Sequence, residues 1–489
     1  ERAGFRRKYF ADWPENAFIC GMIAANKGWP SRKSFPEAME AFAMLAQNHP
    51  EARLYLHSYP GVDFKGPPLQ EMAQHFGIAE KVRIANSNIL IGGDYTDEMM
   101  REIYCSLDVL LSPSQGEGFG LPIVEAQSCG TSVIVNDHCF DSKTRAVTVN
   151  GPRPISDLRL GDYVWTLEPS TKTMQARPIT RIIQQPYQGA LWRFKSRRLN
   201  LLVTPSHRML TRPKWASNLR FRKAQEMTHH WYLPLTANDW IGIDRPTISV
   251  SEFYNQDELY CNAHRLPAEL PLLDLMELLG WYIAEGSVSD DHKSPRHSAI
   301  RFSEPVDGKY RAELETLLAK LGLCFGRYAW GISLRYAALS ALFKQAGSSA
   351  HSKRIPPWVL QLSKPCLRAL FQGMMQGDGT KEGTGQWKAY ATVSEGLTHD
   401  LVEVCLKLGY VPRVRWYPAA KGGKIGLRQI EGGDHWIVRV SYTSETLIRK
   451  SIVSQVDYNG EVWCVEVEGT GNLLVEREGD YVFSGNSAM

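Results

Sequence analysis

An α/β sequence pattern breaks off at residue 138 and resumes only at residue 487. Up to residue 138, short apolar runs alternate with amphipathic helical patterns, and a series of β-type segments begins at Cys139. If residues 139–486 are removed, His138 meets Ser487 and the α/β pattern continues without a break. The chain therefore has the organisation of one protein interrupted by a long insert.

The residues at the two ends of the insert carry the groups that a self-excising segment needs. Cys139 supplies a thiol that can take over the acyl group of the preceding residue. Asn486 has a side-chain amide that can attack its own backbone carbonyl and cut the chain. Ser487 supplies a hydroxyl that can accept and keep the acyl group. These groups predict a protein-splicing precursor that joins His138 to Ser487.

Length and composition limit the alternatives. A chain of 489 residues predicts roughly three domains, and a hydrophobic content of 43% is ordinary for a globular protein. No apolar run reaches the ~18 residues that a membrane span needs. The nine cysteines show no CxxC spacing, so we expect neither a disulfide framework nor a zinc cluster, and we expect a cytoplasmic location. The net charge of +4 permits nucleic-acid binding without indicating it.

The first segment repeats a strand–helix pattern. Such βα units predict a parallel, doubly wound sheet. The chain begins without Met or an apolar signal core, so we expect a fragment of a longer protein. Strands are expected at residues 18–24, 52–57, 82–85, 109–112 and 132–135, and helices at residues 36–49, 69–76, 96–106 and 121–129.

Residues 116–125 (GEGFGLPIVE) hold two carboxylates, Glu117 and Glu125, around a Gly-rich loop that opens a helix. Such a loop presents backbone N–H groups to a phosphate or a sugar hydroxyl. The stretch resembles the E-x7-E signature of retaining, nucleotide-sugar-dependent glycosyltransferases with two Rossmann-like domains. The resemblance implies that Glu117 faces the donor sugar, Glu125 the ribose and Lys33 the donor phosphates. The alternative is a loop acid and a helix-surface acid without a binding role.

Four stretches of the insert resemble the conserved blocks of inteins. They lie at residues 150–164, 202–207 (LVTPSH), 460–475 and 481–486 (YVFSGN). The resemblance implies an all-β HINT-type splicing domain that is discontinuous, and it needs no cofactor. It also implies that His207, with Thr204, polarises or protonates the scissile amide.

Three positions depart from the intein pattern. Gly485 and Gly471 stand where histidines are usual, and Cys464 stands where an aspartate is usual. A variant class of inteins uses a cysteine at the place of Cys464 as its first nucleophile, but inteins of that class lack an N-terminal cysteine. We therefore expect Cys139 to be the first nucleophile and Cys464 an assistant or branch site. Because Gly485 offers no proton donor, we expect a slow final step that Gly485→His would accelerate.

Residues 278–286 (LLGWYIAEG) and 371–379 (FQGMMQGDG) share one layout. Each predicts an apolar helix with small residues for close helix contact, ending in an acid and a glycine cap. Residues 317–323 (LLAKLGL) echo residues 404–410 (VCLKLGY), which indicates an internal two-fold repeat. The repeat resembles a monomeric LAGLIDADG homing endonuclease, an α+β fold.

That resemblance implies a set of site residues and a partner. Glu285 and Asp378 would hold Mg²⁺ at the scissile phosphates, and Lys353 would be a further catalytic residue. Strands after each helix would lie in the major groove of double-stranded DNA, the allele that lacks the insert. Scattered cations support this weakly, because such residues usually form a solvated face: Lys293, Arg296, Arg301, Arg311, Arg327, Arg335, Lys353, Arg354, Lys388, Arg413, Arg415, Lys421, Lys424 and Arg428.

The predicted organisation is a glycosyltransferase fragment at 1–138, splicing segments at 139–250 and 451–486, an endonuclease domain at 251–450 and the resumed host at 487–489. The intein is expected to be monomeric, and the spliced host to use a nucleotide sugar. Two alternatives remain at this point. The insert could be a regulatory, non-splicing insertion in a glycosyltransferase, or a splicing element whose endonuclease binds DNA without cutting it.

Overall fold

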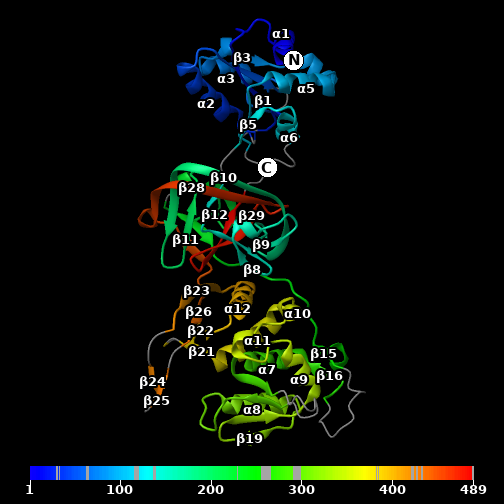
Figure 1. Ribbon diagram of the computed structural model, residues 1–489, viewed down its shortest axis with the longest axis vertical. Helices are drawn as coiled ribbons and strands as arrows, with labels where there is room; N and C mark the ends of the chain where they lie inside the picture. The colour runs from blue at the N-terminus through cyan, green and yellow to red at the C-terminus, as the bar shows by residue number, and fades with distance from the viewer. Residues whose placement is uncertain are drawn as a thin grey trace. The chain divides into compact units, whose positions relative to one another are not determined.

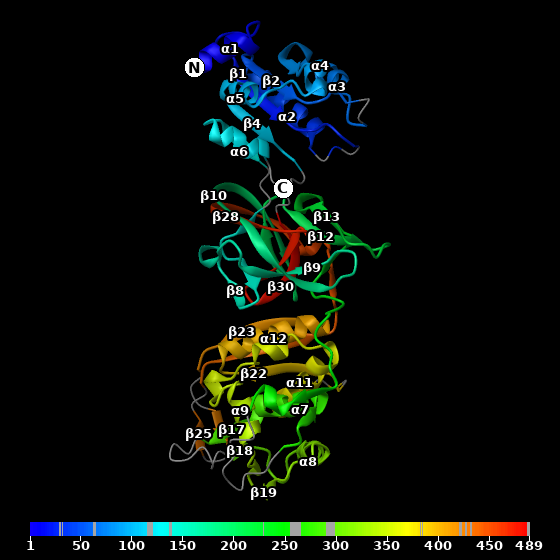
Figure 2. The ribbon, with the colours of Figure 1, turned by 90° about the vertical axis from the view of Figure 1, so that its right-hand side faces the viewer.

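The chain divides into two compact units, and the second of them is Cys139–Asn486. The first unit contains the chain that precedes Cys139. Figures 1 and 2 show the ribbon from two directions. No helix among the described residues is long and apolar enough to cross a membrane. The computed structural model describes residues 1–28, 31, 33–61, 65–114, 121–135, 139–227, 229–254, 266–289, 299–381, 383, 385–419, 423–425, 428–430 and 433–486.

The first unit is built on a five-stranded parallel sheet in the order β3-β2-β1-β4-β5. Neighbouring residues of β2 point to opposite faces, so Leu54 and Tyr55 enter two separate apolar clusters, one on each face. The predicted doubly wound sheet is thereby confirmed. The strands are β1 (Phe18–Ile23), β2 (Ala52–His57), β3 (Val82–Ile84), β4 (Val109–Ser112) and β5 (Ser132–Val135); the helices are α1 (Arg2–Tyr9), α2 (Phe35–Asn48), α3 (Leu69–His75), α4 (Ser87–Gly92), α5 (Asp97–Ser106) and α6 (Leu121–Ser128).

The second unit opens and closes with strands that share one sheet. The long strands β10 (Met174–Lys195) and β28 (Val453–Val467) pair antiparallel from Ile179↔Val467 to Phe194↔Val453. Short β6 (Phe140–Asp141) pairs with both β28 and β11. The other strands of this part are β7 (Arg145–Thr148), β8 (Gly151–Arg153), β9 (Tyr163–Leu167), β11 (Asn200–Val203), β12 (Arg208–Pro213), β13 (Arg220–Lys223), β14 (Trp231–Pro234), β27 (Glu445–Leu447), β29 (Asn472–Arg477) and β30 (Asp480–Gly485).

Helices α7 (Leu272–Glu285) and α11 (Lys364–Gly377) lie side by side (Figure 1). Glycines set their separation. A Cβ added at Gly280 would lie 2.2 Å from the carbonyl oxygen of Leu370, and one at Gly373 would lie 2.1 Å from that of Glu277. Only glycine allows such an approach of two backbones, so the predicted close helix contact is confirmed.

Each of these helices begins a succession of two strands, a helix and two strands, although among the described residues only the first copy continues into a further helix (Ala337–Lys344). The two resulting sheets have the orders β17-β18-β20-β19 and β21-β22-β26-β23, so strands in corresponding places occupy corresponding positions. This topology confirms the internal repeat. The first copy contains β17 (Gly286–Ser289), β18 (Ala299–Phe302), α8 (Arg311–Lys320), β19 (Gly326–Tyr328), β20 (Gly331–Leu334) and α9 (Ala337–Lys344); the second contains β21 (Gly379–Lys381), β22 (Trp387–Thr392), α12 (Glu395–Leu408), β23 (Val411–Tyr417) and β26 (His435–Ser441), and β15 (Thr247–Ser249), β16 (Glu269–Pro271), α10 (Pro357–Leu360), β24 (Gly423–Ile425) and β25 (Arg428–Ile430) lie outside the repeated pattern.

The predicted glycine cap is found after α7 but not after α11. Gly286 occupies the cap position of α7 with an extended backbone (φ −90°, ψ 149°) rather than a left-handed one, and Asp378 occupies the cap position after α11. Glycine is needed here for space instead. A Cβ at Gly286 would lie 2.3 Å from Cδ2 of Tyr282, and one at Gly379 would lie 2.3 Å from the carbonyl oxygen of Met375. Each helix therefore passes directly into a strand folded back against its last turn.

The all-β part and the repeated part of the second unit share contacts. Strand β23 pairs with β30 through Arg413↔Asp480. The ammonium of Lys407 on α12 is fully buried, 3.7 Å from the ring of Trp240 and 4.7 Å from that of Trp165 on β9. One apolar core continues through both parts. The all-β part and the repeated part are therefore packed together as one body. The domain boundaries near residues 250 and 450 remain predictions.

Candidate active sites

Cys139 lies at the start of the second unit, with Thr204 beside its backbone. Cys139 is only 2% exposed. The Cys139 N–H donates to Thr204 Oγ1 (3.0 Å), and the Thr204 N–H donates to the Cys139 carbonyl (3.0 Å). This exchange follows from the pairing of β11 with β6, which brings Val203 opposite Phe140. The predicted nucleophile and the predicted threonine are therefore in direct contact.

His207 lies between the two ends of the unit. Its ring is fully buried, 4.4 Å from the ring of Phe140, the residue after Cys139. Its Nε2 shares a 2.9 Å hydrogen bond with Oγ of Ser484, on the last strand β30. The imidazole therefore contacts both the first and the last strands of the unit. A serine in a strand carries no distinctive signal, so the sequence alone does not single out Ser484.

Asn486 is completely buried at the end of the unit. Its N–H donates to the carbonyl of Gly471 (3.1 Å), and within the described residues neither its Oδ1 nor its Nδ2 has a hydrogen-bond partner. A buried amide without partners is costly. This side chain is therefore not held away from its own backbone by competing hydrogen bonds.

The expected benefit of Gly485→His is contradicted by the space around Gly485. A Cβ at that position would lie 1.9 Å from the carbonyl oxygen of Arg208 and 2.8 Å from its carbon. Arg208 begins β12 directly after His207, so the backbone that carries His207 occupies the place where a side chain at 485 would begin. Any side chain there would require the backbone at Arg208, next to His207, to shift.

Cys464 lies across from Cys139. In the antiparallel register of β28 and β6, Trp463 pairs with Phe140, and Cys464 therefore follows opposite Cys139. Both thiols are buried in one small cluster with Leu191, Leu202 and Val462. This proximity suits the assistant or branch role expected from the sequence, which remains a prediction.

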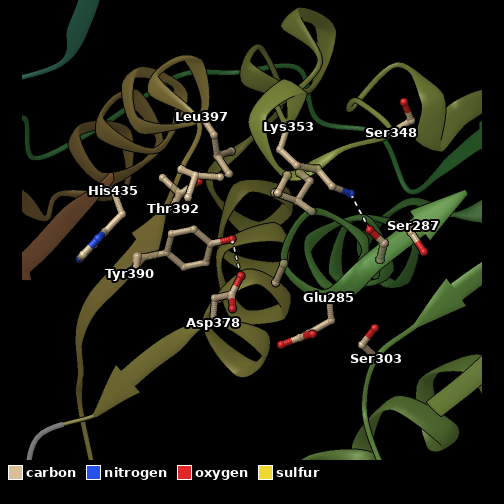
Figure 3. Close-up of a pocket in the computed structure, with 16 residues that line it drawn as sticks. Glu285, Ser287, Ser303, Ser348, Lys353, Asp378, Tyr390, Thr392, Leu397 and His435 are labelled. Atoms are coloured by element: carbon tan, nitrogen blue, oxygen red, sulfur yellow. Dashed lines mark hydrogen bonds between the residues drawn. The ribbon is translucent and has the colours of Figure 1, made fainter. Parts of the chain in front are cut away.

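Glu285 and Asp378 lie at the ends of the paired helices α7 and α11. Figure 3 shows the two carboxylates beside one another. Both line a cavity of about 420 Å³. The Tyr390 hydroxyl on β22 is 3.5 Å from Asp378 Oδ2, and His435 on β26 also lines the cavity. The structure thus brings together the two acids predicted from the repeat. Tyr390 and His435 escaped sequence analysis because they come from strands in the second copy alone.

The carboxylates sit in surroundings that disfavour their charged forms. Burial, followed by repulsion from Asp378 and Glu304, raises the pKa of Glu285 to about 7. Burial raises the pKa of Asp378 to about 6, although its side chain reaches solvent, while the Tyr390 hydrogen bond and the charge of Lys353 act in the opposite direction.

Lys353 reaches the same cavity from the segment before α10. It is buried, and its ammonium donates to the carbonyls of Tyr282 (2.7 Å) and Gly286 (2.9 Å) at the end of α7. The Nζ also lies 3.5 Å from the centre of the Tyr282 ring. Burial lowers the pKa of Lys353 to about 7, against the attraction of Asp378. It therefore fixes the end of the helix that carries Glu285 and supplies a cation near Asp378.

The donor set fits a magnesium ion. Among the described residues no group of three or more His, Cys, Asp or Glu side chains is placed to hold a metal. Mg²⁺, however, takes one or two carboxylates and completes its octahedron with water and substrate phosphate. A cation between Glu285 and Asp378 would offset the repulsion that raises the pKa of Glu285.

The host residues predicted from the E-x7-E resemblance are only partly described. Glu117 lies outside the described residues. The Glu125 carboxylate, on exposed α6, accepts a 2.7 Å hydrogen bond from the Tyr104 hydroxyl on α5. Lys33 is half-buried just before α2. Their nucleotide-binding roles remain predictions.

The raised pKa of Glu285 predicts a pH-dependent stability. Below about pH 4.5 the carboxyl is protonated both folded and unfolded, and between 4.5 and 7 only the unfolded chain releases the proton. Stability is therefore lost as pH rises through this window. We expect Glu285→Gln to stabilise the chain at pH 8 and to change little at pH 4, as measured by urea unfolding in EDTA.

The control for this measurement is Glu313→Gln, a change at an exposed acid in the first turn of α8. Glu313→Gln should change the stability to the same small extent at pH 4 and at pH 8. A stability gain from Glu285→Gln that is equal at both pH values would contradict the raised pKa of Glu285.

Comparison with known proteins identifies a relationship for the first unit. Residues 29–151 match the family model described as Glycosyl transferases group 1, a match that runs past the end of that unit. Mannosylfructose-phosphate synthase of Agrobacterium fabrum is 29% identical over 124 residues, which cover 24% of this chain and 24% of that protein.

Two longer alignments match this chain to proteins whose names have nothing to do with glycosyl transfer. The ATP-dependent Clp protease proteolytic subunit of Chlamydomonas moewusii is 22% identical over 298 residues (57% of this chain, 29% of that protein). The DNA-directed RNA polymerase subunit beta C-terminal section of Stigeoclonium helveticum is 23% identical over 405 residues (72% and 36%). The chain thus spans about a quarter to a third of the length of these curated relatives.

Solved structures overlap with parts of the chain. The C-terminal domain of a glycosyl transferase group 1 protein (LpcC) of Francisella tularensis has a TM-score of 0.21 and 22% identity, covering 28% of this chain and 64% of that one. Anabaena HepE in complex with UDP and glucose scores 0.20 at 21% identity (27% and 32%). The AceL NrdHF class 3 split intein scores 0.19 at 19% identity (20% and 63%). The family match, rather than these overlaps, shows that a group 1 glycosyltransferase domain is present at residues 29–151.

Proposed function

We propose that Cys139–Asn486 excises itself and joins the flanking segments of a glycosyltransferase. The observation that carries this proposal is the convergence of both ends of the unit on His207. Thr204 exchanges hydrogen bonds with Cys139, while His207 bonds to Ser484 two residues before Asn486. The division of the chain at Cys139 and Asn486 further supports it, since the insert then folds as a unit of its own.

The first half of the reaction moves the acyl group to sulfur. The Cys139 thiolate attacks the carbonyl carbon of residue 138, the peptide bond breaks, and the amide nitrogen of Cys139 leaves as an amine. That nitrogen is the atom whose N–H donates to Thr204 Oγ1, 3.0 Å away. Thr204 therefore orients the leaving group, and His207 supplies the proton it needs.

The second half releases the insert. The hydroxyl of Ser487 takes the acyl group from the thioester, which gives a branched ester and returns the Cys139 thiol. Nδ2 of Asn486 then attacks the carbonyl carbon of Asn486, forming a cyclic imide and freeing the amine of Ser487. That amine displaces the ester, and a peptide bond joins His138 to Ser487. No cofactor is consumed, because each acyl transfer exchanges one acyl bond for another.

Cyclisation of Asn486 needs proton transfer that Gly485 cannot provide. The nearest acid–base pair described along β30 is Ser484 with His207, whose hydrogen bond is 2.9 Å long. We infer that Ser484 positions His207 toward the second junction. One imidazole would then assist at both cleavage points.

The relatives support an insert that moves between hosts. The alignments of 298 and 405 residues are longer than the whole Glu1–His138 segment, so both extend into the second unit. Their names, a protease subunit and a polymerase subunit, have no activity in common with a glycosyltransferase. Similarity shared by such different proteins is expected of an inserted element.

The junction chemistry is tested by expressing the chain and weighing its products. We expect a free Cys139–Asn486 segment and a joined host in the wild type, and neither in Cys139→Ala, because no thiol remains to accept the acyl group. Asn486→Ala should block release while hydroxylamine still cleaves before Cys139. Cys324→Ala, at an exposed thiol, should splice normally.

Two outcomes would overturn parts of this mechanism. A wild-type chain that stays intact would favour the regulatory insertion. Splicing by Cys139→Ala that stops only when Cys464→Ala is added would make Cys464 the first nucleophile.

The role of Ser484 predicts an effect confined to the second junction. Ser484→Ala should slow C-terminal cleavage by up to about 10², the lower range of acid–base catalysis, and should alter its pH profile. Hydroxylamine cleavage before Cys139 should persist, and Ser484→Thr, which keeps the hydroxyl, should restore the rate. Ser156→Ala, in an exposed turn, is the control. A uniform loss of both cleavages would indicate a structural role.

The repeated part is proposed to be a homing endonuclease of the LAGLIDADG type. Its support is the shared topology of the two copies, with one carboxylate at the end of each paired helix. Magnesium at Glu285 and Asp378 would supply charge to stabilise a phosphate transition state. Lys353 holds the end of α7 through the Tyr282 and Gly286 carbonyls and lines the same cavity as the two carboxylates.

The nuclease is tested on a duplex that encodes residues 135–138 followed directly by residues 487–489. We expect the wild type to cut both strands with magnesium. Glu285→Gln and Asp378→Asn should each lower the rate by about 10³ or more, since a lost metal ligand is worth several kcal/mol. Splicing should continue in both variants.

Asp307→Asn changes an exposed acid of the first copy and serves as the control. Failure of the wild type to cut while still binding the duplex would indicate a DNA-binding module without catalysis. Loss of splicing in the carboxylate variants would show that the shared core couples the two activities.

The spliced host is proposed to transfer a sugar from a nucleotide donor. The matched group 1 family and the complex of HepE with UDP and glucose support a donor of this class. Lys33, Glu117 and Glu125 are the residues we assign to it. A cytoplasmic site for both activities is part of the same proposal.

A further inference from the structure

A second cavity of the insert is lined by cations. It has a volume of about 300 Å³ and lies between the turn after β10 and the sheet of the second copy. Its polar lining includes Gln386, Ser441 and Thr443, and among the described residues no carboxylate lines it. The charged residues around it are Arg197, Arg198, Lys388, Arg413 and Arg439.

Three of these five cations form no ion pair within the described residues. Arg413 faces Arg439 directly across the β23–β26 pairing, an arrangement that repels. Arg413 pairs with Asp480 (2.9 Å), but within the described residues Arg197, Arg198 and Arg439 form no ion pair. A cavity that gathers unneutralised guanidinium groups favours an anion, because guanidinium binds phosphate with two parallel hydrogen bonds.

The cavity lies on the same two strands as the carboxylate site. Trp387 and Lys388 of β22 line the cationic cavity, and Tyr390 to Thr392 of the same strand line the carboxylate cavity. On β26, Arg439 lines the cationic cavity and His435 lines the carboxylate cavity. Four residues of a strand span about 13 Å, which is about four base pairs of a duplex at ~3.4 Å each. One duplex can therefore reach both cavities.

We propose that this cavity binds backbone phosphates of the duplex held by the endonuclease, and that Arg197 and Arg198 are contributed to it by the splicing part. The inference rests on the proposed nuclease function. Arg413 and Arg439 lie on the sheet face opposite to Val438 and Val440, which pack in the core with α12. The splicing part thus adds affinity that is independent of sequence, since phosphates carry no sequence information.

The test measures binding of the junction duplex as a function of salt, in the full chain kept in one piece by Cys139→Ala and Asn486→Ala. Arg197→Ala with Arg198→Ala should weaken binding and reduce the slope of log Kobs against log[salt] by about 1.8, for two lost phosphate contacts. Between about 50 and 200 mM salt the affinity ratio should change about tenfold. Arg439→Gln should reduce the slope by about 0.9.

The matched control is Arg220→Ala with Arg222→Ala. These arginines lie on β13 of the same part, where their guanidinium groups cover the Trp231 ring at 4.8 and 4.4 Å. The control removes the same charge and should leave the slope unchanged. Equal losses of affinity and of slope in both double variants would mean that the effect depends only on net charge, and the proposed phosphate site would then be wrong.

Other outcomes separate this inference from the one beneath it. If the parent chain does not bind the duplex at all, the nuclease proposal fails as well. If it binds and the Arg197→Ala, Arg198→Ala variant binds equally with the same slope, only the cavity assignment is overturned. If inorganic phosphate at constant ionic strength stabilises the chain as strongly as the duplex does, the cavity is a free-anion site and the DNA assignment is wrong.

Discussion

The antiparallel pairing of β10 with β28 holds the second unit together. It joins residues near position 180 to residues near position 465, so the whole repeated part is contained between two strands of one sheet. Because β6 pairs with β28 as well, the same register brings Cys139 opposite Cys464. A shift by one residue would turn every side chain of β28 to the other face and separate these thiols. The geometry of the first junction therefore depends on a pairing formed far from it in sequence.

Close backbone packing replaces side-chain chemistry at the second junction. The carbonyl of Arg208 excludes any side chain from position 485, and His207 makes its contact one residue further back, at Ser484. A missing histidine at this place is therefore not a simple deletion of a catalytic group. The neighbouring strand β12 has taken its space, and a buried imidazole already lies within hydrogen-bond distance of β30.

The carboxylate pair shows how the helix contact and the electrostatics depend on each other. Gly280 and Gly373 let α7 and α11 approach until Glu285 and Asp378 share one cavity. Burial and mutual repulsion then raise the pKa of Glu285. The charge of Lys353 counteracts the raised pKa of Asp378, and its ammonium at the same time donates to two carbonyls at the end of α7. Such a strained group of charges is typical of a functional site rather than of a stabilising ion pair.

Features that depend on a local pattern could be predicted from the amino-acid sequence. Alternating strand and helix periods gave the doubly wound sheet, and the echo of residues 278–286 in 371–379 gave the repeat and its two acids, because hydrophobic period and small residues report directly on which faces pack. Which residues contact one another across the fold could be read only from the tertiary structure. The contact of Ser484 with His207, the exclusion at Gly485, the extended Gly286 and the cations gathered from a turn and a sheet all join residues distant in sequence. Their positions follow from strand register and close packing, which no local pattern encodes.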